Sequence, residues 1–340
     1  MATQPAQDDD IILFHYPFSP FARRVVWYLQ LRGIPYAECI QPFVLPRPDL
    51  GALGVNYRRI PLLAIGRDIY LDTRLILRKL EAKFPEGKLG SDKVEDRIVE
   101  GLLERYMVEG PVFWAATGLI PPSSVKDPKF AKDRQGFGGR DWTPESLERG
   151  RGECLSYIKD CFDFLEGTIL ADGREWVLKT SKPSLADIEA IWPFDWLVHL
   201  KGSLPRNVVS EEQFPRVFGW ISRFRAALDA AVSSAPKPKS LAGPEAARRM
   251  FASEVKKCLD SVDANDALGL RKGEEVEIYP TDFGSEPQHR DRGRLVILTK
   301  DEVAVVAAGG GAGGREVRIH APRTGFRITK IDRKAASIKL

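Results

Sequence analysis

The spacing of apolar residues near the start of the chain predicts a buried strand followed by a helix. Ile11–Phe14 is a continuous apolar run, which is typical of a buried strand. Pro17 and Pro20 exclude continued ladder pairing after it, and apolar residues then recur at helical spacing up to Gly33, a residue type that commonly ends a helix. Ser19 directly precedes Pro20, as an N-cap serine precedes a proline in the first helical position. We therefore expect Ser19 on a strand-to-helix turn, beside unpaired helix amides that favour an anion.

The same alternation of strand and helix patterns continues up to Pro85. Further strands are expected at 35–40, 58–65 and 69–71, and helices at 50–53 and 75–80. Pro61 lies in the second of these strands, and Asp72-Thr73 precede the second helix. This order predicts an α/β unit built around one small sheet.

From residue 93 to 235 the apolar spacing is helical. Helices are expected at 93–119, 144–170 and 214–232, with a long Pro/Gly-rich loop at 121–143. Ser184 and Asp187 have the spacing of a capping box before an apolar run, with aspartate in place of the usual glutamate. These features predict an all-α domain.

The pattern changes again after the Pro/Lys-rich segment 236–240, whose composition is that of a linker. A helix is expected at 245–259, followed by period-two strands at 275–279, 294–298, 302–307, 315–320 and 326–331. The glycine run Gly309–Gly314 is expected at a hairpin tip, and it lacks the Gly-Lys-Ser/Thr of a phosphate loop. The predicted fold class is therefore multidomain: an α/β domain, an all-α bundle and a small all-β domain such as a compact barrel.

Composition and charge argue against several classes of protein but do not indicate a function. The net charge is +4, and the basic excess after residue 236 is too small for a nucleic-acid footprint, so nucleic acid is not an expected partner. The cysteines are widely spaced, and the polar, acidic N-terminus does not resemble a secretory signal, so we expect a reducing, cytoplasmic location. No apolar run approaches the roughly 20 residues that span a bilayer, and the scattered histidines indicate no metal site.

Four short motifs together resemble one known family. They are Ser19-Pro20-Phe21 with Arg24-Val25, Gly33-Ile34-Pro35-Tyr36, Arg59-Ile60-Pro61 and Asp72-Thr73. In this order and spacing they resemble the thioredoxin-like domain of glutathione transferases, and Ser184–Asp187 resembles the capping box of that family's helical domain. The chain looks most like fungal members with an extra C-terminal domain. The resemblance implies a glutathione-binding thioredoxin-like domain at 10–86, an all-α domain at 93–235, and a helix with a small all-β domain at 244–340.

The resemblance implies that Ser19 is the catalytic residue, because it occupies the family's catalytic serine or cysteine position. Glutathione reacts as its thiolate, and lowering a thiol pKa from about 8.5 to below 7 takes roughly 2 kcal/mol of preferential anion stabilisation. A hydrogen bond to a charged group contributes about 1.5–3 kcal/mol and a helix N-terminus up to about 2 kcal/mol, so no general base is required. The alternatives are that Ser19 only caps the helix, or that the hydroxyl of Tyr16 acts instead.

The resemblance also assigns the residues that would hold glutathione as cofactor or co-substrate. Pro61 is expected to be a cis-proline, and backbone groups of the preceding Ile60 would pair with glutathione's cysteine like an added strand. Asp72 and Thr73 stand at the family's Glu-Ser position, where Asp72 would neutralise the ammonium and Thr73 would receive the carboxylate of the γ-glutamyl group. The alternative is a plain N-cap pair. Arg58 and Arg59 could face the glycyl carboxylate of glutathione, but they are interpreted as a solvated basic pair.

We therefore expect a glutathione transferase-like enzyme whose partners are glutathione, an apolar electrophile and a second copy of the chain in a homodimer. The reaction could be conjugation or glutathione-dependent isomerisation or lyase chemistry, since the same thiolate serves each. The competing hypothesis is a non-catalytic binding or scaffold protein of the same fold. Aromatic residues of the helical domain, among them Trp114 and Trp192, are candidates for the second-substrate pocket, although such residues more often belong to the core.

Overall fold

The computed structural model describes residues 10–253, 261–308 and 315–331. The predicted hairpin tip Gly309–Gly314 and the end of the predicted helix 245–259 lie outside these ranges. The chain forms two compact units. The first, which we call the sheet unit, consists of Met1–Ser19, Tyr36–Ile76 and Pro238–Leu340, and the second, the helical unit, consists of Pro20–Pro35 and Leu77–Lys237.

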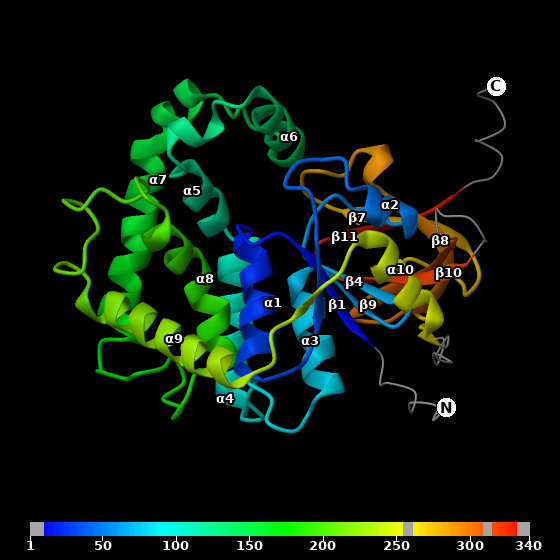
Figure 1. Ribbon diagram of the computed structural model, residues 1–340, viewed down its shortest axis with the longest axis horizontal. Coiled ribbons are helices and arrows are strands. Elements are labelled where there is room, and N and C mark those ends of the chain that lie inside the picture. Colours follow the sequence, from blue (N-terminus) through cyan, green and yellow to red (C-terminus); the bar gives the residue numbers. More distant parts are fainter. Residues whose placement is uncertain (1–9, 254–260, 309–314, 332–340) are drawn as a thin grey trace. The chain divides into compact units, whose positions relative to one another are not determined.

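The N-terminal strands form the expected thioredoxin-like arrangement (Figure 1). Strand β1 pairs in parallel with β2 and antiparallel with β3, which in turn pairs antiparallel with β4. Two strands are shorter than predicted, β2 Ala37–Ile40 and β3 Leu62–Ile65, and two are one residue longer, β1 Ile11–His15 and β4 Asp68–Leu71. The short helix α2, Pro48–Ala52, lies between β2 and β3 in the chain, and α3, Thr73–Lys83, begins two residues after β4.

The C-terminal strands extend this same sheet (Figure 1). Strand β10 pairs in parallel with β4, with Arg318, Ile319 and His320 opposite Asp68, Ile69 and Tyr70. Among the described residues the sheet has 11 strands, in the order β11-β7-β8-β9-β10-β4-β3-β1-β2-β5, and β6 pairs with β8. The C-terminal strands are β6 Ser261–Val262, β7 Glu275–Pro280, β8 Asp291–Leu298, β9 Glu302–Ala308, β10 Glu316–Pro322 and β11 Phe326–Lys330.

These strands therefore do not close into a separate barrel, and they belong to one unit with the strands of the predicted first domain, whereas residues 20–35 and 77–86 of that domain belong to the helical unit. The physical reason is that both sets of strands bury their apolar side chains in one core, which includes Ile69 and Leu71 of β4 and Ile319 and Ala321 of β10. The predicted linker also joins the sheet, because β5, Lys239–Ser240, pairs in parallel with β2. Helix α10, Gly243–Ala252, follows β5 and buries Ala246 and Met250 in the same core.

A buried polar cluster lies where β4 meets β10. His320 is 3% exposed and contacts Glu302 Oε1 through Nδ1 (2.6 Å) and Asp68 Oδ1 through Nε2 (3.0 Å). Arg318 donates two further hydrogen bonds to Asp68. Burial alone would lower the pKa of His320, but the hydrogen bonds to the two carboxylates outweigh it and raise that pKa. The cluster links the N-terminal part of the sheet to its C-terminal part.

The helical unit confirms the predicted all-α pattern (Figure 1). Its elements are α1 Pro20–Leu31, most of α3, α4 Val94–Glu104, η1 Arg105–Glu109, α5 Val112–Gly118, η2 Pro122–Val125, α6 Pro128–Gly138, α7 Pro144–Phe164, η3 Leu165–Ile169, α8 Leu185–His199 and α9 Pro215–Ser234. Helix α1 ends as predicted, since Gly33 adopts φ +59° and the amide of Ile34 bonds to the carbonyl of Leu29 (2.9 Å). The Ser184–Asp187 capping box is also present at the start of α8.

The predicted loop 121–143 is wrong, because it contains α6. Asp127 caps this helix by accepting a hydrogen bond from the Lys129 amide (2.9 Å), Pro128 occupies its first turn, and Gly139 ends it at φ +63°. Elsewhere in the helical unit, Arg24 of α1 and Glu189 of α8 form a fully buried ion pair. Among the described residues no helix is both long and apolar enough to cross a bilayer.

Candidate functional site

The predicted site segments all adjoin one end of the sheet. In the strand register, Phe14 of β1 lies opposite Leu62 of β3, and Leu62 lies opposite Leu71 of β4. The segment Tyr16–Ser19 follows β1, Ile60-Pro61 precede β3, and Asp72-Thr73 follow β4. The register therefore brings these three segments, all of the sheet unit, to the same edge.

Ser19 occupies the expected turn between strand and helix. Its backbone amide donates to the carbonyl of Tyr16 (3.1 Å), and helix α1 begins at the next residue, Pro20. Tyr16 is half-buried and packs edge-on against the ring of Phe43 (5.5 Å between centroids). Ser19 itself is only 3% exposed.

The Ile60–Pro61 peptide bond is cis, as predicted. The interpretation of the two preceding arginines as a solvated pair is wrong. Arg58 is buried, and its carbonyl accepts a hydrogen bond from the guanidinium of Arg47. Arg59 forms an ion pair with Asp282 in the loop between β7 and β8 (Nη2 to Oδ1, 2.6 Å).

Asp72 and Thr73 lie at the start of α3, but the carboxylate of Asp72 already has a cationic partner. Its Oδ1 accepts hydrogen bonds from the amide and Nε of Arg74 (both 3.0 Å), and its Oδ2 accepts one from Nη2 of Arg74 (2.8 Å). Asp72 adopts φ +65°, in the left-handed region that aspartate tolerates better than most residues. Thr73 is buried. The Asp72 side chain thus combines helix capping with a bidentate ion pair.

Sequence reasoning missed two carboxylates that the C-terminal strands bring to this edge. One is Asp282, the partner of Arg59. The other is Asp291 of β8, whose Oδ1 accepts a hydrogen bond from the amide of Asn56 (2.6 Å), and whose pKa burial raises to about 7. The phenol of Tyr57 is buried beside them, and its ring lies 5.7 Å from that of Phe326 between centroids, with the two planes tilted by 35°. No sequence motif marks these residues, because their positions depend on the pairing of β10 with β4.

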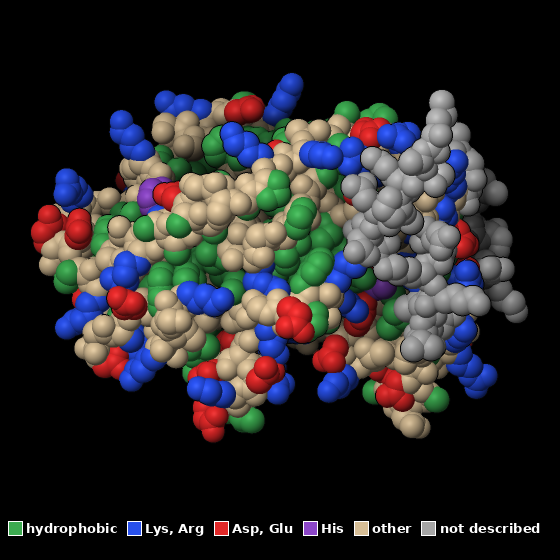
Figure 2. Space-filling model, turned by 60° about the horizontal axis from the view of Figure 1, so that its bottom comes forward, with side chains coloured by type: hydrophobic (Ala, Val, Ile, Leu, Met, Phe, Trp, Pro, Cys, Tyr) green, Lys and Arg blue, Asp and Glu red, His purple; other side chains and the backbone are tan. Residues whose placement is uncertain are grey.

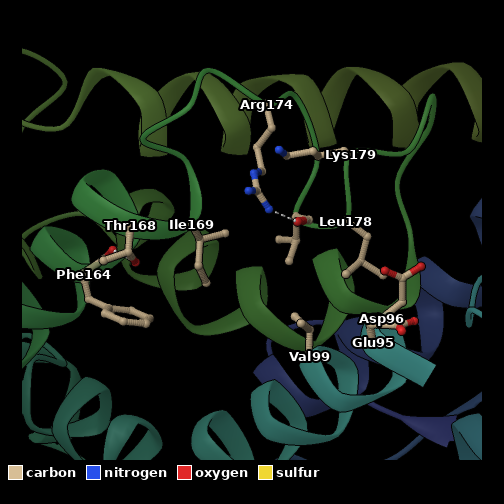
Figure 3. A pocket seen from close by; sticks show the side chains of 10 residues that line it. Glu95, Asp96, Val99, Phe164, Thr168, Ile169, Arg174, Leu178 and Lys179 are labelled. Atoms are coloured by element: carbon tan, nitrogen blue, oxygen red, sulfur yellow. Dashed lines mark hydrogen bonds between the residues drawn. The ribbon is translucent and has the colours of Figure 1, made fainter. Parts of the chain in front are cut away.

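The two aromatic candidates of the helical unit differ in burial, since Trp192 belongs to the core and Trp114 is half-buried. Trp192 is fully buried and lies 6.1 Å from Phe113 between ring centroids. The unit does have a pocket of about 480 Å³, shown in Figure 3, whose lining includes Arg174 and Lys179 on one side and Glu95 and Asp96 on another. Both cations already pair with Asp172 (2.8 and 2.7 Å). We therefore assign no ligand to this pocket.

The surface shows no continuous basic region on the face seen in Figure 2. Lys and Arg side chains there are interspersed with Asp and Glu side chains. Nucleic-acid binding needs basic side chains gathered on one face. This face therefore gives no support to a nucleic-acid partner.

Comparisons with known proteins agree with the fold. The family model "Glutathione S-transferase, N-terminal domain" matches residues 13–88, and a domain of unknown function, DUF7962, matches residues 115–233. A curated relative, glutathione S-transferase U1 of Arabidopsis thaliana, is 24% identical over 217 residues, which cover 63% of this chain and 84% of the relative.

Two solved structures share the fold. A glutathione transferase-like protein from Pseudomonas syringae is 23% identical and covers 95% of this chain and 100% of its own, with a TM-score of 0.68. A glutathione S-transferase from Rhodospirillum rubrum is 17% identical and covers 67% and 94%, with a TM-score of 0.51. The first match spans nearly the whole chain and comes from a bacterium, so the fungal type stays a prediction. Residues 13–88 thus match the N-terminal domain of glutathione S-transferases, and the chain as a whole shares the fold of a glutathione transferase-like protein.

Proposed function

We propose that the protein binds glutathione at the edge of the sheet unit and holds its sulfur as a thiolate beside Ser19 for attack on an apolar electrophile. Ile60 and Pro61 would pair with the cysteine of glutathione, and Asp72 and Thr73 would lie at its γ-glutamyl end. Conjugation, isomerisation and lyase chemistry all begin with this thiolate. The second substrate is thus proposed only as an electrophile of apolar character.

The observation that carries the proposal is the register of the sheet. It brings the residue before α1, the residues before β3 and the first residues of α3 to one edge. Glutathione is an extended tripeptide, so a site for it needs separate partners for its thiol, its backbone and its γ-glutamyl group. The three segments offer a hydroxyl, backbone groups before a strand, and a helix start, respectively.

Two observations favour the competing function, a non-catalytic protein of the same fold. Ser19 is 3% exposed, which fits a buried helix-start serine as well as a catalytic one. In addition, Arg74 occupies both oxygens of Asp72, so this carboxylate is already neutralised. A protein that keeps the fold without turnover would bind glutathione weakly or not at all.

The test is calorimetric titration with glutathione, followed by turnover of an activated aryl chloride. The enzyme hypothesis predicts that the chain binds glutathione and that Ser19→Ala lowers kcat/KM by at least tenfold, because one charge-assisted hydrogen bond contributes about 1.5–3 kcal/mol. Tyr16→Phe is the matched hydroxyl control. If Ser19→Ala keeps full activity and Tyr16→Phe loses it, the catalytic hydroxyl belongs to Tyr16. If the chain does not bind glutathione, the scaffold hypothesis replaces the enzyme.

We further propose a homodimer formed through helix α4. Val94, Ile98 and Leu102 recur every fourth residue along α4 and are all exposed, and Tyr106 continues the same row into η1. Phe164 of α7 is exposed as well. A row of apolar side chains at this spacing forms one helix face, and a second copy of the same face is a partner of matching chemistry.

A further inference from the structure

The C-terminal strands contribute directly to the proposed glutathione site. Arg59, which immediately precedes Ile60-Pro61, is held by Asp282 through its carboxylate and by Phe283 through its carbonyl oxygen. Both partners lie in the loop between β7 and β8. The conformation of the segment before β3 therefore depends on this loop.

The Asp72–Arg74 segment of the proposed site also contacts the C-terminal strands. A Cβ atom added to Gly325, in the turn between β10 and β11, would lie 2.9 Å from Nη2 of Arg74, so the guanidinium packs against this glycine. The carbonyl of Gly325 accepts a hydrogen bond from the amide of Thr281 (3.0 Å), the residue before Asp282. An unbroken series of contacts thus runs from Asp72 through Arg74, Gly325 and Thr281 to Asp282.

The four charges at this edge act on one buried group. Burial raises the pKa of the Tyr57 hydroxyl, Asp72 and Asp282 raise it further, and Arg59 and Arg74 lower it. Two carboxylates and two guanidinium groups therefore lie near the same phenol, and their formal charges sum to zero. They differ in accessibility: the side chain of Asp72 is 12% exposed and bidentately paired, whereas that of Asp282 is 48% exposed.

We propose that Asp282, supplied by the C-terminal strands, is the carboxylate that receives the α-ammonium group of glutathione. This inference rests on the proposed function. An ammonium group needs an accessible carboxylate oxygen, and Asp72 offers both of its oxygens to Arg74. Asp282 receives one hydrogen bond from Arg59 and keeps nearly half of its side chain exposed. Asp72 then serves to position Arg74 and the start of α3.

The experiment compares two ligands on four full-length variants by titration calorimetry. The ligands are glutathione and its deamino analogue, glutaryl-cysteinyl-glycine, which lacks only the α-ammonium group. Asp282→Asn should weaken glutathione binding about tenfold more than binding of the analogue, since both ligands are affected by the weakened Arg59 ion pair but only glutathione loses an ammonium contact. Asp282→Glu should restore part of the loss. Asp72→Asn should weaken both ligands equally, and Glu274→Gln, which breaks a surface ion pair with Lys330, should change neither.

Three results would overturn the inference. Equal losses for both ligands with Asp282→Asn would show that Asp282 acts only by holding Arg59. A selective loss of glutathione with Asp72→Asn and none with Asp282→Asn would assign the ammonium to Asp72. Absence of glutathione binding by the unmodified chain would overturn the proposed function and the inference with it, and this outcome is distinguishable because it precedes any substitution.

Discussion

His320 should make the pairing of β4 with β10, which we call the β4–β10 joint, sensitive to pH. Its replacement should destabilise this pairing. The imidazole lies between Asp68 and Glu302, and both carboxylates are largely buried. His320→Gln removes the positive charge and can donate to only one of them. Breaking a buried ion pair typically costs 3–5 kcal/mol, and Arg318 still neutralises Asp68, so we expect a loss of about 3 kcal/mol.

The sign of the pH effect follows from the raised pKa of His320. A raised pKa in the folded state means that the proton stabilises the fold. This contribution is present in full below the unfolded value near 6.5 and is lost as pH rises through the higher folded value. The unmodified sheet unit should therefore lose stability as pH rises above about 6.5 and through the raised folded-state pKa of His320. The His320→Gln variant should lack this decline.

The assay must report on the sheet unit. All seven tryptophans of the chain lie in the helical unit, so tryptophan fluorescence would not follow the joint. Hydrogen exchange of the Arg318 amide, which donates to the Arg67 carbonyl (3.0 Å), reports on it directly. A loss of about 3 kcal/mol corresponds to roughly a hundredfold faster exchange at neutral pH. His289→Gln, on a short turn of the same unit, is the matched control.

The prediction would be refuted if the Arg318 amide exchanged its hydrogen at the same rate in the His320→Gln variant as in the unmodified chain. It would equally be refuted if the variant kept the loss of protection that the unmodified chain shows as pH rises above about 6.5. Amides of β1, elsewhere in the same sheet, show whether any change is local to the joint.

Three further substitutions test other parts of the structure. Arg24→Leu leaves the carboxylate of Glu189 buried without this ion-pair partner, so it should lower the free energy of unfolding in urea, followed by tryptophan fluorescence, by about 3 kcal/mol. The double variant Arg24→Leu/Glu189→Leu should recover most of this loss, and no recovery would contradict the burial argument. Gly325→Ala puts a Cβ atom at a residue with φ +80° and 2.9 Å from Nη2 of Arg74, so it should lower the free energy of unfolding by about 1–3 kcal/mol. Thermal unfolding followed by circular dichroism measures this loss, and an unchanged midpoint would show that the turn relaxes freely. Leu102→Glu should convert the proposed dimer to a monomer in sedimentation velocity, and an unaltered sedimentation coefficient would remove α4 from the interface.

Local chemistry could be predicted from the sequence. The turn at Ser19, the glycine end of α1 and the capping box of α8 each depend on residues a few positions apart, and the structure confirms their local geometry. Helix α6 had the same kinds of signal in Asp127 and Gly139, but its many charged and glycine residues gave no clear apolar face.

Long-range pairing could not be predicted in the same way. Arg318 lies opposite Asp68 because two distant strands share one core, and no short motif specifies such a register. For this reason the C-terminal strands were expected to form a domain of their own. The same pairing places Asp282 beside Arg59, so this part of the candidate site became visible only with the fold.

The central claim is that glutathione is held as a thiolate beside Ser19, and the pKa of the bound thiol tests it most directly. Ultraviolet absorbance of the thiolate, recorded against pH at saturating glutathione, gives this value. We expect a thiol pKa below about 7 on the unmodified chain and a pKa higher by about 1 or more on Ser19→Ala, which loses the hydroxyl but keeps the start of α1. Equal pKa values on the two chains, or a bound thiol that titrates like free glutathione, would contradict the account.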